Sequence, residues 1–155
     1  MDQSEQKALD DIEEFGCHVL QIMAEGEFPP FSYSIGITKK LRKPEVVVIG
    51  LKEPIAGFLV NEYNTRVQAG EDFTPGKMYD GFLEGFACTF EPVAKRHFKE
   101  YFGWGRWLYG GNNFEVLQLI YPTTSGLWPW SPDYPAGFIA WQPMLTDTGK
   151  SRFRG

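Results

Sequence analysis

Three polar side chains stand in otherwise apolar stretches, where they would either anchor the fold or contact a ligand. Tyr33 lies within FSYSIGI, Glu45 directly precedes VVVIG, and Asn61 interrupts an apolar helical stripe. A buried polar group without a hydrogen-bond partner costs about 1–3 kcal/mol, so an inward-facing residue of this kind needs one. We favour partners within the protein; ligand contacts in a cleft are the alternative.

A second group joins one amide to several large rings. Gln118 is the polar residue inside the apolar run VLQLI. Trp128, Trp130 and Tyr134 follow in LWPWSPDYP, here called the aromatic–proline segment (residues 127–135). An amide can hold a loop backbone or bind a ligand, and Trp and Tyr often anchor interfaces. We favour a structural role for Gln118, and we expect one Trp to close the core while the other lies at the rim of a cleft.

Histidine and cysteine give no catalytic or metal-binding pattern. His18 and His97 are far apart, and no spacing is typical of a zinc or iron site, so no metal site is predicted. His97 is expected to be a hydrogen-bonded core or cleft-edge side chain rather than a base. Cys17 and Cys88 have apolar neighbours and are predicted to be buried, reduced thiols. GxSxG, GxxxxGK[ST] and GxGxxG are all absent, so the catalytic residues are unknown.

Composition limits the classes of partner. The chain has 155 residues, is 43% hydrophobic and 16% aromatic, and carries a net charge of −5 with a pI near 5.1. Nucleic-acid binders usually present a basic face, so no nucleic-acid partner is predicted. The acidic N-terminus lacks an apolar signal region, and no apolar run is long enough to cross a membrane, so we expect a cytoplasmic protein with no membrane partner.

Hydrophobic periodicity predicts three helices, over residues 3–15, 54–70 and 92–102. The first begins with a capping box, in which Asp2 caps the helix and Glu5 stands three residues later. Apolar runs predict strands over residues 17–24, 31–37, 44–51, 82–92, 114–122 and 137–145.

Two features of these strands bear on the fold. The unbroken VVVI of residues 46–49 indicates burial on both faces, and the strands 31–37 and 44–51 should pair antiparallel across a short charged loop. Residues 17–24 also fit a helical period, so a longer first helix is the alternative. The Gly- and aromatic-rich residues 103–113 are predicted to form a loop.

Together these elements predict an α+β fold: a single layered domain, residues 1–155, with a mostly antiparallel (mixed) sheet and two to three helices packed on one side of it. Residues 146–155 are expected to form a mobile tail.

The order of these motifs resembles the bacterial domain of unknown function DUF4262, over residues 16–143. The resemblance rests on FSYSIGI, PEVVVIGL, a following helix and the late VLQLIYP with its Gly, WPW and Gln, and on these residues: Phe31, Tyr33, Gly36, Pro44, Glu45, Gly50, Gly70, Gln118, Pro122, Gly126, Pro129, Trp130 and Gln142. In that family an Asp often follows the proline, whereas here Thr123 follows Pro122. The element order is also similar to flavin-binding split barrels.

Two classes of function are consistent with the sequence. The first is a non-catalytic interaction protein, of an immunity or inhibitor type, that uses Trp128, Trp130 and Tyr134 of the aromatic–proline segment to bind a protein partner or a second copy of itself. The second is a small-molecule protein or enzyme with an aromatic-lined pocket for a flavin or nucleotide. In that case the polar contacts would come from Tyr33, Asn61, Arg66, His97 and Gln118.

Overall fold

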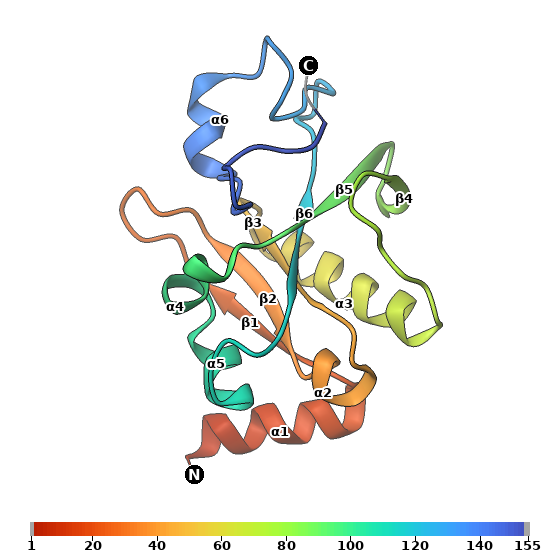
Figure 1. Ribbon diagram of the computed structural model, residues 1–155, viewed down its shortest axis with the longest axis vertical. Coiled ribbons are helices and arrows are strands. Elements are labelled where there is room, and N and C mark those ends of the chain that lie inside the picture. The colour runs from red at the N-terminus through yellow and green to blue at the C-terminus, as the bar shows by residue number, and fades with distance from the viewer. Residues whose placement is uncertain (1, 154–155) are drawn as a thin grey trace.

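The structure, a computed structural model, describes residues 2–153. Its centre is a mixed sheet of six strands in the order β1-β2-β3-β6-β5-β4 (Figure 1). The strands are β1 (His18–Ile22), β2 (Phe31–Ile35), β3 (Glu45–Ile49), β4 (Met78–Leu83), β5 (Phe86–Pro92) and β6 (Val116–Ile120). Neighbouring strands pair antiparallel except β3 and β6, which are parallel. The predicted α+β class is confirmed, and the sheet is open, with β1 and β4 at its edges.

Helices cover both faces of the sheet, so the expectation of helices on one side is wrong. The helices are α1 (Gln3–Phe15), α2 (Ile37–Leu41), α3 (Ile55–Gln68), the 3-10 turn Lys95–His97, α4 (Phe98–Tyr101), α5 (Gly103–Tyr109) and α6 (Ala136–Trp141). On one face, Leu59 and Tyr63 of α3 pack with Val46 and Val48. On the other face, Val47 packs in a cluster with residues of α1 and α4. The continuous VVVI run of β3 therefore supplies both cores, as its sequence predicted.

The N-terminal elements follow the sequence closely. Asp2 accepts a hydrogen bond from Glu5 N at 2.8 Å and Asp2 N donates to the Glu5 carboxylate, which confirms the capping box. Gly16 ends α1 in the left-handed region at φ 89°. Residues 18–22 form β1, so the alternative of a longer first helix is wrong. None of the helices in residues 2–153 is long and apolar enough to cross a membrane.

Two of the errors in the predicted elements have backbone causes. Pro92 is the last residue of β5, and Val93 N still donates to Val116 O, so the chain follows the sheet and turns helical only at Lys95. Residues 103–109 form helix α5 rather than a loop, and Gly105 lets this helix approach Phe114: a Cβ there would lie 2.8 Å from the ring.

The remaining errors concern short elements. Residues 136–141 form helix α6 rather than a strand; Pro135 before it is extended, and Gln142 follows it. The predicted strand 82–92 is two strands: residues 78–83 form β4, which pairs with β5 across the turn at Glu84 and Gly85. Residue 37, predicted to end a strand, and residues 38–41 of the predicted charged loop form α2.

Glu45 joins α2, β2 and α5 from inside the protein. Its carboxylate is fully buried and accepts hydrogen bonds from Ser34 Oγ at 2.8 Å and Thr38 N at 3.0 Å. Ile37 N at 3.3 Å and Tyr109 Oη at 2.5 Å donate to it as well. Burial raises the pKa of this carboxyl, and the hydrogen bond from Tyr109 opposes that effect. With all four donors inside the protein, Glu45 serves as a structural anchor.

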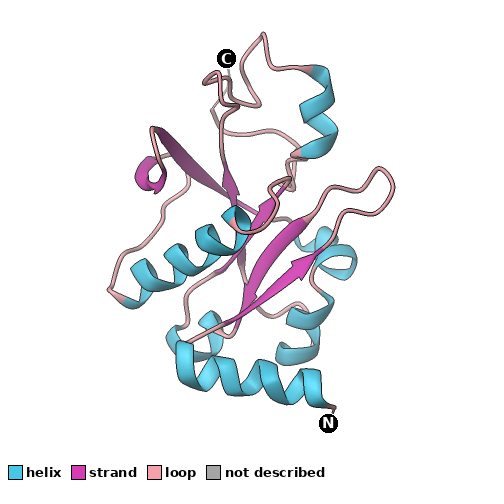
Figure 2. Ribbon diagram, turned by 180° about the vertical axis from the view of Figure 1, so that it is seen from behind, coloured by secondary structure: helices cyan, strands magenta, loops and turns pink. Residues whose placement is uncertain are grey.

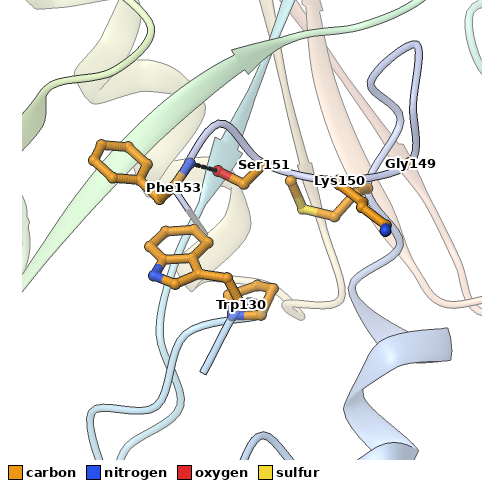
Figure 3. A pocket seen from close by; sticks show the side chains of 7 residues that line it. Trp130, Gly149, Lys150, Ser151 and Phe153 are labelled. Carbon is orange, nitrogen blue, oxygen red and sulfur yellow. Dashed lines mark hydrogen bonds between the residues drawn. The ribbon is translucent and has the colours of Figure 1, made fainter. Parts of the chain in front are cut away.

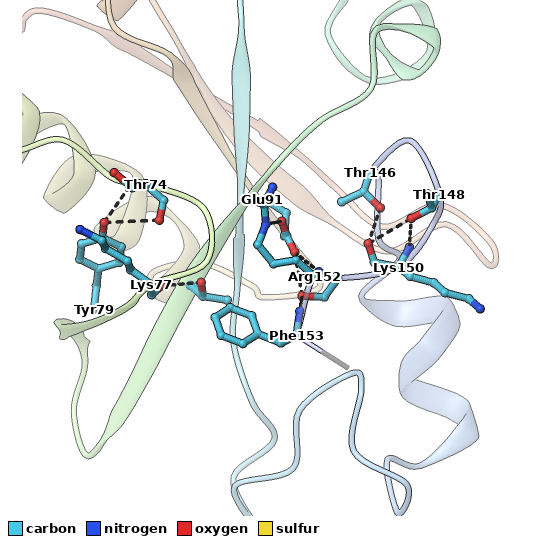
Figure 4. Close-up of polar contacts among 11 residues, drawn as sticks. Thr74, Lys77, Tyr79, Glu91, Thr146, Thr148, Lys150, Arg152 and Phe153 are labelled. Carbon is cyan, nitrogen blue, oxygen red and sulfur yellow. Dashed lines mark hydrogen bonds and ion pairs between the residues drawn. The ribbon is translucent and has the colours of Figure 1, made fainter. Parts of the chain in front are cut away.

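The C-terminal residues are held by a second buried carboxylate. Glu91 on β5 accepts from Ser151 Oγ at 2.7 Å, Arg152 N at 2.8 Å and Arg152 Nε at 2.9 Å (Figure 4). Ser151 is buried and Thr146 is buried, whereas residues 147–150 between them are exposed, so the mobility expected of residues 146–155 stays a prediction. Residues 154 and 155 of that tail lie outside the described part of the chain.

Both cysteines are free and buried, and we predict that they react only when the protein unfolds. Burial raises the pKa of the Cys17 and Cys88 thiols to about 12. At pH 8 the reactive thiolate is therefore scarce in the folded state, whereas an unfolded thiol has a pKa of about 8.5. Iodoacetamide labelling at pH 8, followed by mass spectrometry, should be at least 100-fold slower in buffer than in 6 M guanidinium. Fast labelling of either thiol in buffer would contradict this.

Candidate functional site

Because β3 and β6 are parallel, their carboxyl ends lie side by side at one end of the sheet. Ile22, Phe31 and Ile49 are paired in one row across β1, β2 and β3, and Ile120 pairs with Thr89 on the other side. Beyond this row the chain leaves each strand through a loop. Helix α6 lies at this end of the molecule and α1 lies at the other (Figures 1 and 2). In sheets with parallel neighbours, crevices outside the carboxyl ends of the strands are common ligand sites.

A cavity of about 620 Å³ lies at this end of the sheet, and we call it the α6 cavity. It is formed by the exits of β3 and β6, the first residue of α3, the β4–β5 turn and α6. Its volume is in the range of small-molecule sites. The lining residues are Gly50, Leu51, Ile55, Leu83, Glu84, Phe86, Tyr121–Ser125, Leu127, Tyr134, Pro135, Phe138, Trp141 and Gln142. Five of them carry aromatic rings: Phe86, Tyr121, Tyr134, Phe138 and Trp141.

Hydrogen bonds fix the wall that α6 contributes. Tyr121 Oη donates to Ile49 O at 2.6 Å, and Trp141 Nε1 donates to Gly50 O at 2.8 Å. The Gln142 amide accepts from Tyr121 N at 3.1 Å and donates to Tyr121 O at 3.0 Å. Burial raises the pKa of the Tyr121 phenol, which stays protonated and able to donate. The strand ends and α6 therefore form one hydrogen-bonded unit.

Gly50 is required where these contacts converge. Its φ of 92° is in the left-handed region, which favours glycine. A Cβ at this position would lie 2.5 Å from Tyr121 Oη and 2.7 Å from Trp141 O. The close packing of Tyr121 and Trp141 on the β3 exit thus depends on the missing side chain.

Two other hollows differ from the α6 cavity: one has no aromatic ring in its wall, and the other is smaller. A hollow of about 660 Å³ shares Leu51 with it and is lined by Gln21–Ala24, Pro30, Ser32, Lys52 and Glu53, without an aromatic ring. A pocket of about 330 Å³ lies between Trp130 and the C-terminal residues Gly149–Ser151 and Phe153 (Figure 3). Among the described residues, no group of three or more His, Cys, Asp or Glu is placed to hold a metal ion.

The structure brings only one of the predicted binding residues, Tyr134, into the α6 cavity. Tyr33 is buried, and its hydroxyl accepts a hydrogen bond from Trp104 N at 3.2 Å. Gln118 holds the backbone that follows α6: its amide donates to Pro143 O at 2.7 Å and accepts from Leu145 N at 2.9 Å. Asn61 is exposed on α3.

The two remaining polar candidates lie elsewhere. Arg66 is paired with Glu71 at 2.5 Å and its guanidinium stacks on the Phe82 ring at 4.4 Å. His97 is half-buried beside Tyr101, and burial lowers its pKa. The five polar residues expected to share one pocket are thus dispersed over the fold.

The two tryptophans of the aromatic–proline segment stack on each other. Their ring centroids are 4.9 Å apart with an interplanar angle of 12°, and Trp130 also stacks on Phe153 at 5.1 Å. Both are half-buried, so the expectation that one of them closes the core is wrong, whereas Trp130 does line a pocket, as expected of the other. Each ring buries one face of the other. The spacing of the two residues in the sequence does not predict this contact.

Sequence reasoning missed most of the cavity. The lining residues Glu84, Tyr121, Phe138 and Trp141 come from segments that only the fold brings together. One available signal was the turn pair Glu84–Gly85 between two apolar runs, which is typical of a hairpin.

Comparison with known proteins places the chain in a family. Residues 11–135 match the domain of unknown function DUF4262, which is most of the chain. The chain belongs to the DUF4262 family. The match begins before the expected residue 16 and ends before α6, so Gln142 lies outside the DUF4262 region while the β3 exit and the aromatic–proline segment lie inside it. Neither the curated proteins nor the solved structures contain a match to the chain.

Proposed function

We propose that this DUF4262 protein is a non-catalytic binding protein that holds a small, largely apolar ligand in the α6 cavity. The observation that carries this proposal is the cavity itself: about 620 Å³, with five aromatic rings in its wall, at the carboxyl ends of parallel strands. The polar groups of Tyr121, Trp141 and Gln142, which line the cavity, already form hydrogen bonds within the protein. Apolar contacts would therefore dominate the binding of the ligand. Free, buried Cys17 and Cys88 support a cytoplasmic setting as part of the same proposal.

The composition of the lining also bears on the flavin or nucleotide alternative. No Lys or Arg is among the lining residues. Phosphate groups are usually held by basic side chains or by backbone amides at a helix start. The side chains of the lining therefore favour a ligand without phosphate, and among the described helices the start of α3, where Ile55 lines the cavity, is the one long-helix start that borders it.

The first test is titration with N-phenyl-1-naphthylamine, a neutral apolar probe whose fluorescence rises when it leaves water. Thr124 is exposed and lines the cavity, so Thr124→Trp should fill part of the space and weaken probe binding at least tenfold. Thr65 is exposed on α3 away from the cavity, and Thr65→Trp is the matched control that should bind like the wild type. Circular dichroism confirms that both variants fold. Equal binding by Thr124→Trp and the wild type would reject the proposal.

A second candidate function, a protein-interaction or inhibitor role, is supported by exposed apolar side chains near the same edge. Met23 is 86% exposed, Phe28 64% and Ile139 61%. Exposed apolar residues that gather at one site often mark an interface. The stacked Trp128 and Trp130 support this role less, because they already contact each other. Size-exclusion chromatography with light scattering tests self-association, and Met23→Ser with Phe28→Ser should reduce any dimer.

A further inference from the structure

We propose that the ligand of the α6 cavity is an organic cation: an apolar body that carries an amine, with its positive charge held by Glu84. This inference rests on the proposed function and adds the chemical class of the ligand.

Glu84 lies at the turn between β4 and β5, where it lines the cavity. Gly85 follows it at φ 79°, a conformation that closes the tight turn and fixes the position of Glu84 at the rim. Within residues 2–153 its carboxylate has no hydrogen bond or ion pair. Most other acidic side chains near the core are already engaged, as Glu45 and Glu91 are. Glu84 is thus a carboxylate at the cavity with its charge available.

The rest of the lining has no formal charge that would offset Glu84. Every other lining residue is apolar, aromatic, hydroxyl-bearing or an amide. In the neighbouring hollow, Lys52 and Glu53 carry opposite charges and largely cancel. A ligand in the α6 cavity therefore meets one net negative charge beside apolar walls, where water is partly displaced and the attraction between opposite charges is stronger than in bulk solvent.

Aromatic rings around the same space suit a cation as well. Phe86 comes from β5 next to the Glu84 turn, and Tyr134 and Phe138 come from the opposite wall. The faces of such rings attract ammonium groups by about 0.5–2 kcal/mol in proteins. A carboxylate together with several rings is the combination that selects amines over neutral or anionic molecules of the same shape.

The test uses three ligands with one apolar body and different charge: 1-naphthylmethylamine, 1-naphthylmethanol and 1-naphthoate. Each competes with N-phenyl-1-naphthylamine at pH 7 and low salt. We expect the amine to bind about fivefold to tenfold more tightly than the alcohol, and the acid to bind most weakly, since the Glu84 contact is exposed and partly screened. Glu84→Gln should bring the amine within twofold of the alcohol and leave the alcohol unchanged.

Glu27→Gln is the matched control, because Glu27 is exposed and is not a lining residue. It removes the same charge from the protein and should preserve the preference for the amine. Equal affinity for the three ligands, tightest binding of the acid, or an equal loss in both variants would overturn the inference while the cavity proposal stands. Failure of the probe itself to bind in a Thr124-dependent way would instead reject the proposed function.

Discussion

Replacing Glu45 with alanine is expected to destabilise the protein by at least about 3 kcal/mol, the largest effect we predict. The variant leaves the Ser34 and Tyr109 hydroxyls and the amides of Ile37 and Thr38 without the acceptor they share. Each buried donor without a partner costs on the order of 1–3 kcal/mol, partly recovered where water enters the space. Urea denaturation followed by circular dichroism measures the change.

Glu14→Ala is the matched control for Glu45→Ala. Glu14 is exposed on α1, so the same substitution there should change stability by less than about 0.5 kcal/mol. A Glu45→Ala protein as stable as the Glu14→Ala protein would show that the four contacts do not stabilise the fold. Tyr109→Phe removes a single donor, and we expect it to have an intermediate effect.

Gly50→Ala is expected to cost about 2–4 kcal/mol and to abolish binding of the neutral probe in the α6 cavity. Two effects combine. An alanine at φ 92° is strained, and its Cβ would collide with Tyr121 Oη and Trp141 O, which tie α6 to the strand ends. The methyl group should displace α6 and open the cavity wall. Urea denaturation and probe titration, carried out on the same preparation, measure both losses.

Gly70→Ala separates the two effects. Gly70 has φ 98°, nearly that of Gly50, but nothing lies within 4 Å of its Cβ position. This variant should therefore lose about 1 kcal/mol through backbone strain alone and keep full probe binding. If both glycine variants lose the same stability and both bind the probe, the close approach of Tyr121 and Trp141 is unimportant.

The elements with strong local signals could be predicted from the sequence, as α1, α3, β3 and β6 show. A capping box, an apolar stripe, the unbroken VVVI run and the largely apolar VLQLI run each depend on a few neighbouring residues. Helix α6 and strand β4 could not be predicted in the same way. Alternation in GFIAW fits a strand as well as one helical turn, and contacts with Tyr121 and Gly50, far away in the chain, accompany the helix.

The candidate site was harder to predict for a related reason. Tyr33, Gln118 and Glu45 attracted attention as polar residues in apolar runs, and in the structure the surrounding backbone and hydroxyls satisfy them. Residues that instead face an open space, such as Glu84 and Phe138, look ordinary in sequence. The two groups differ in whether another part of the fold lies close enough to form a hydrogen bond with them. The spacing of residues along the sequence does not give that distance.

The parallel pairing of β3 with β6 has a consequence for the newly made chain. Glu45 pairs with Val116, roughly 70 residues later, so a ribosome must add all the residues between them before β3 gains its partner. Before then, the edge of EVVVI that pairs with β6 in the finished fold has no partner, whichever of its pairings with β2 has formed. Unpaired apolar edges recruit other chains. We therefore expect chains that end before residue 116 to aggregate or to be bound by chaperones more than the finished protein, in which β6 covers this edge.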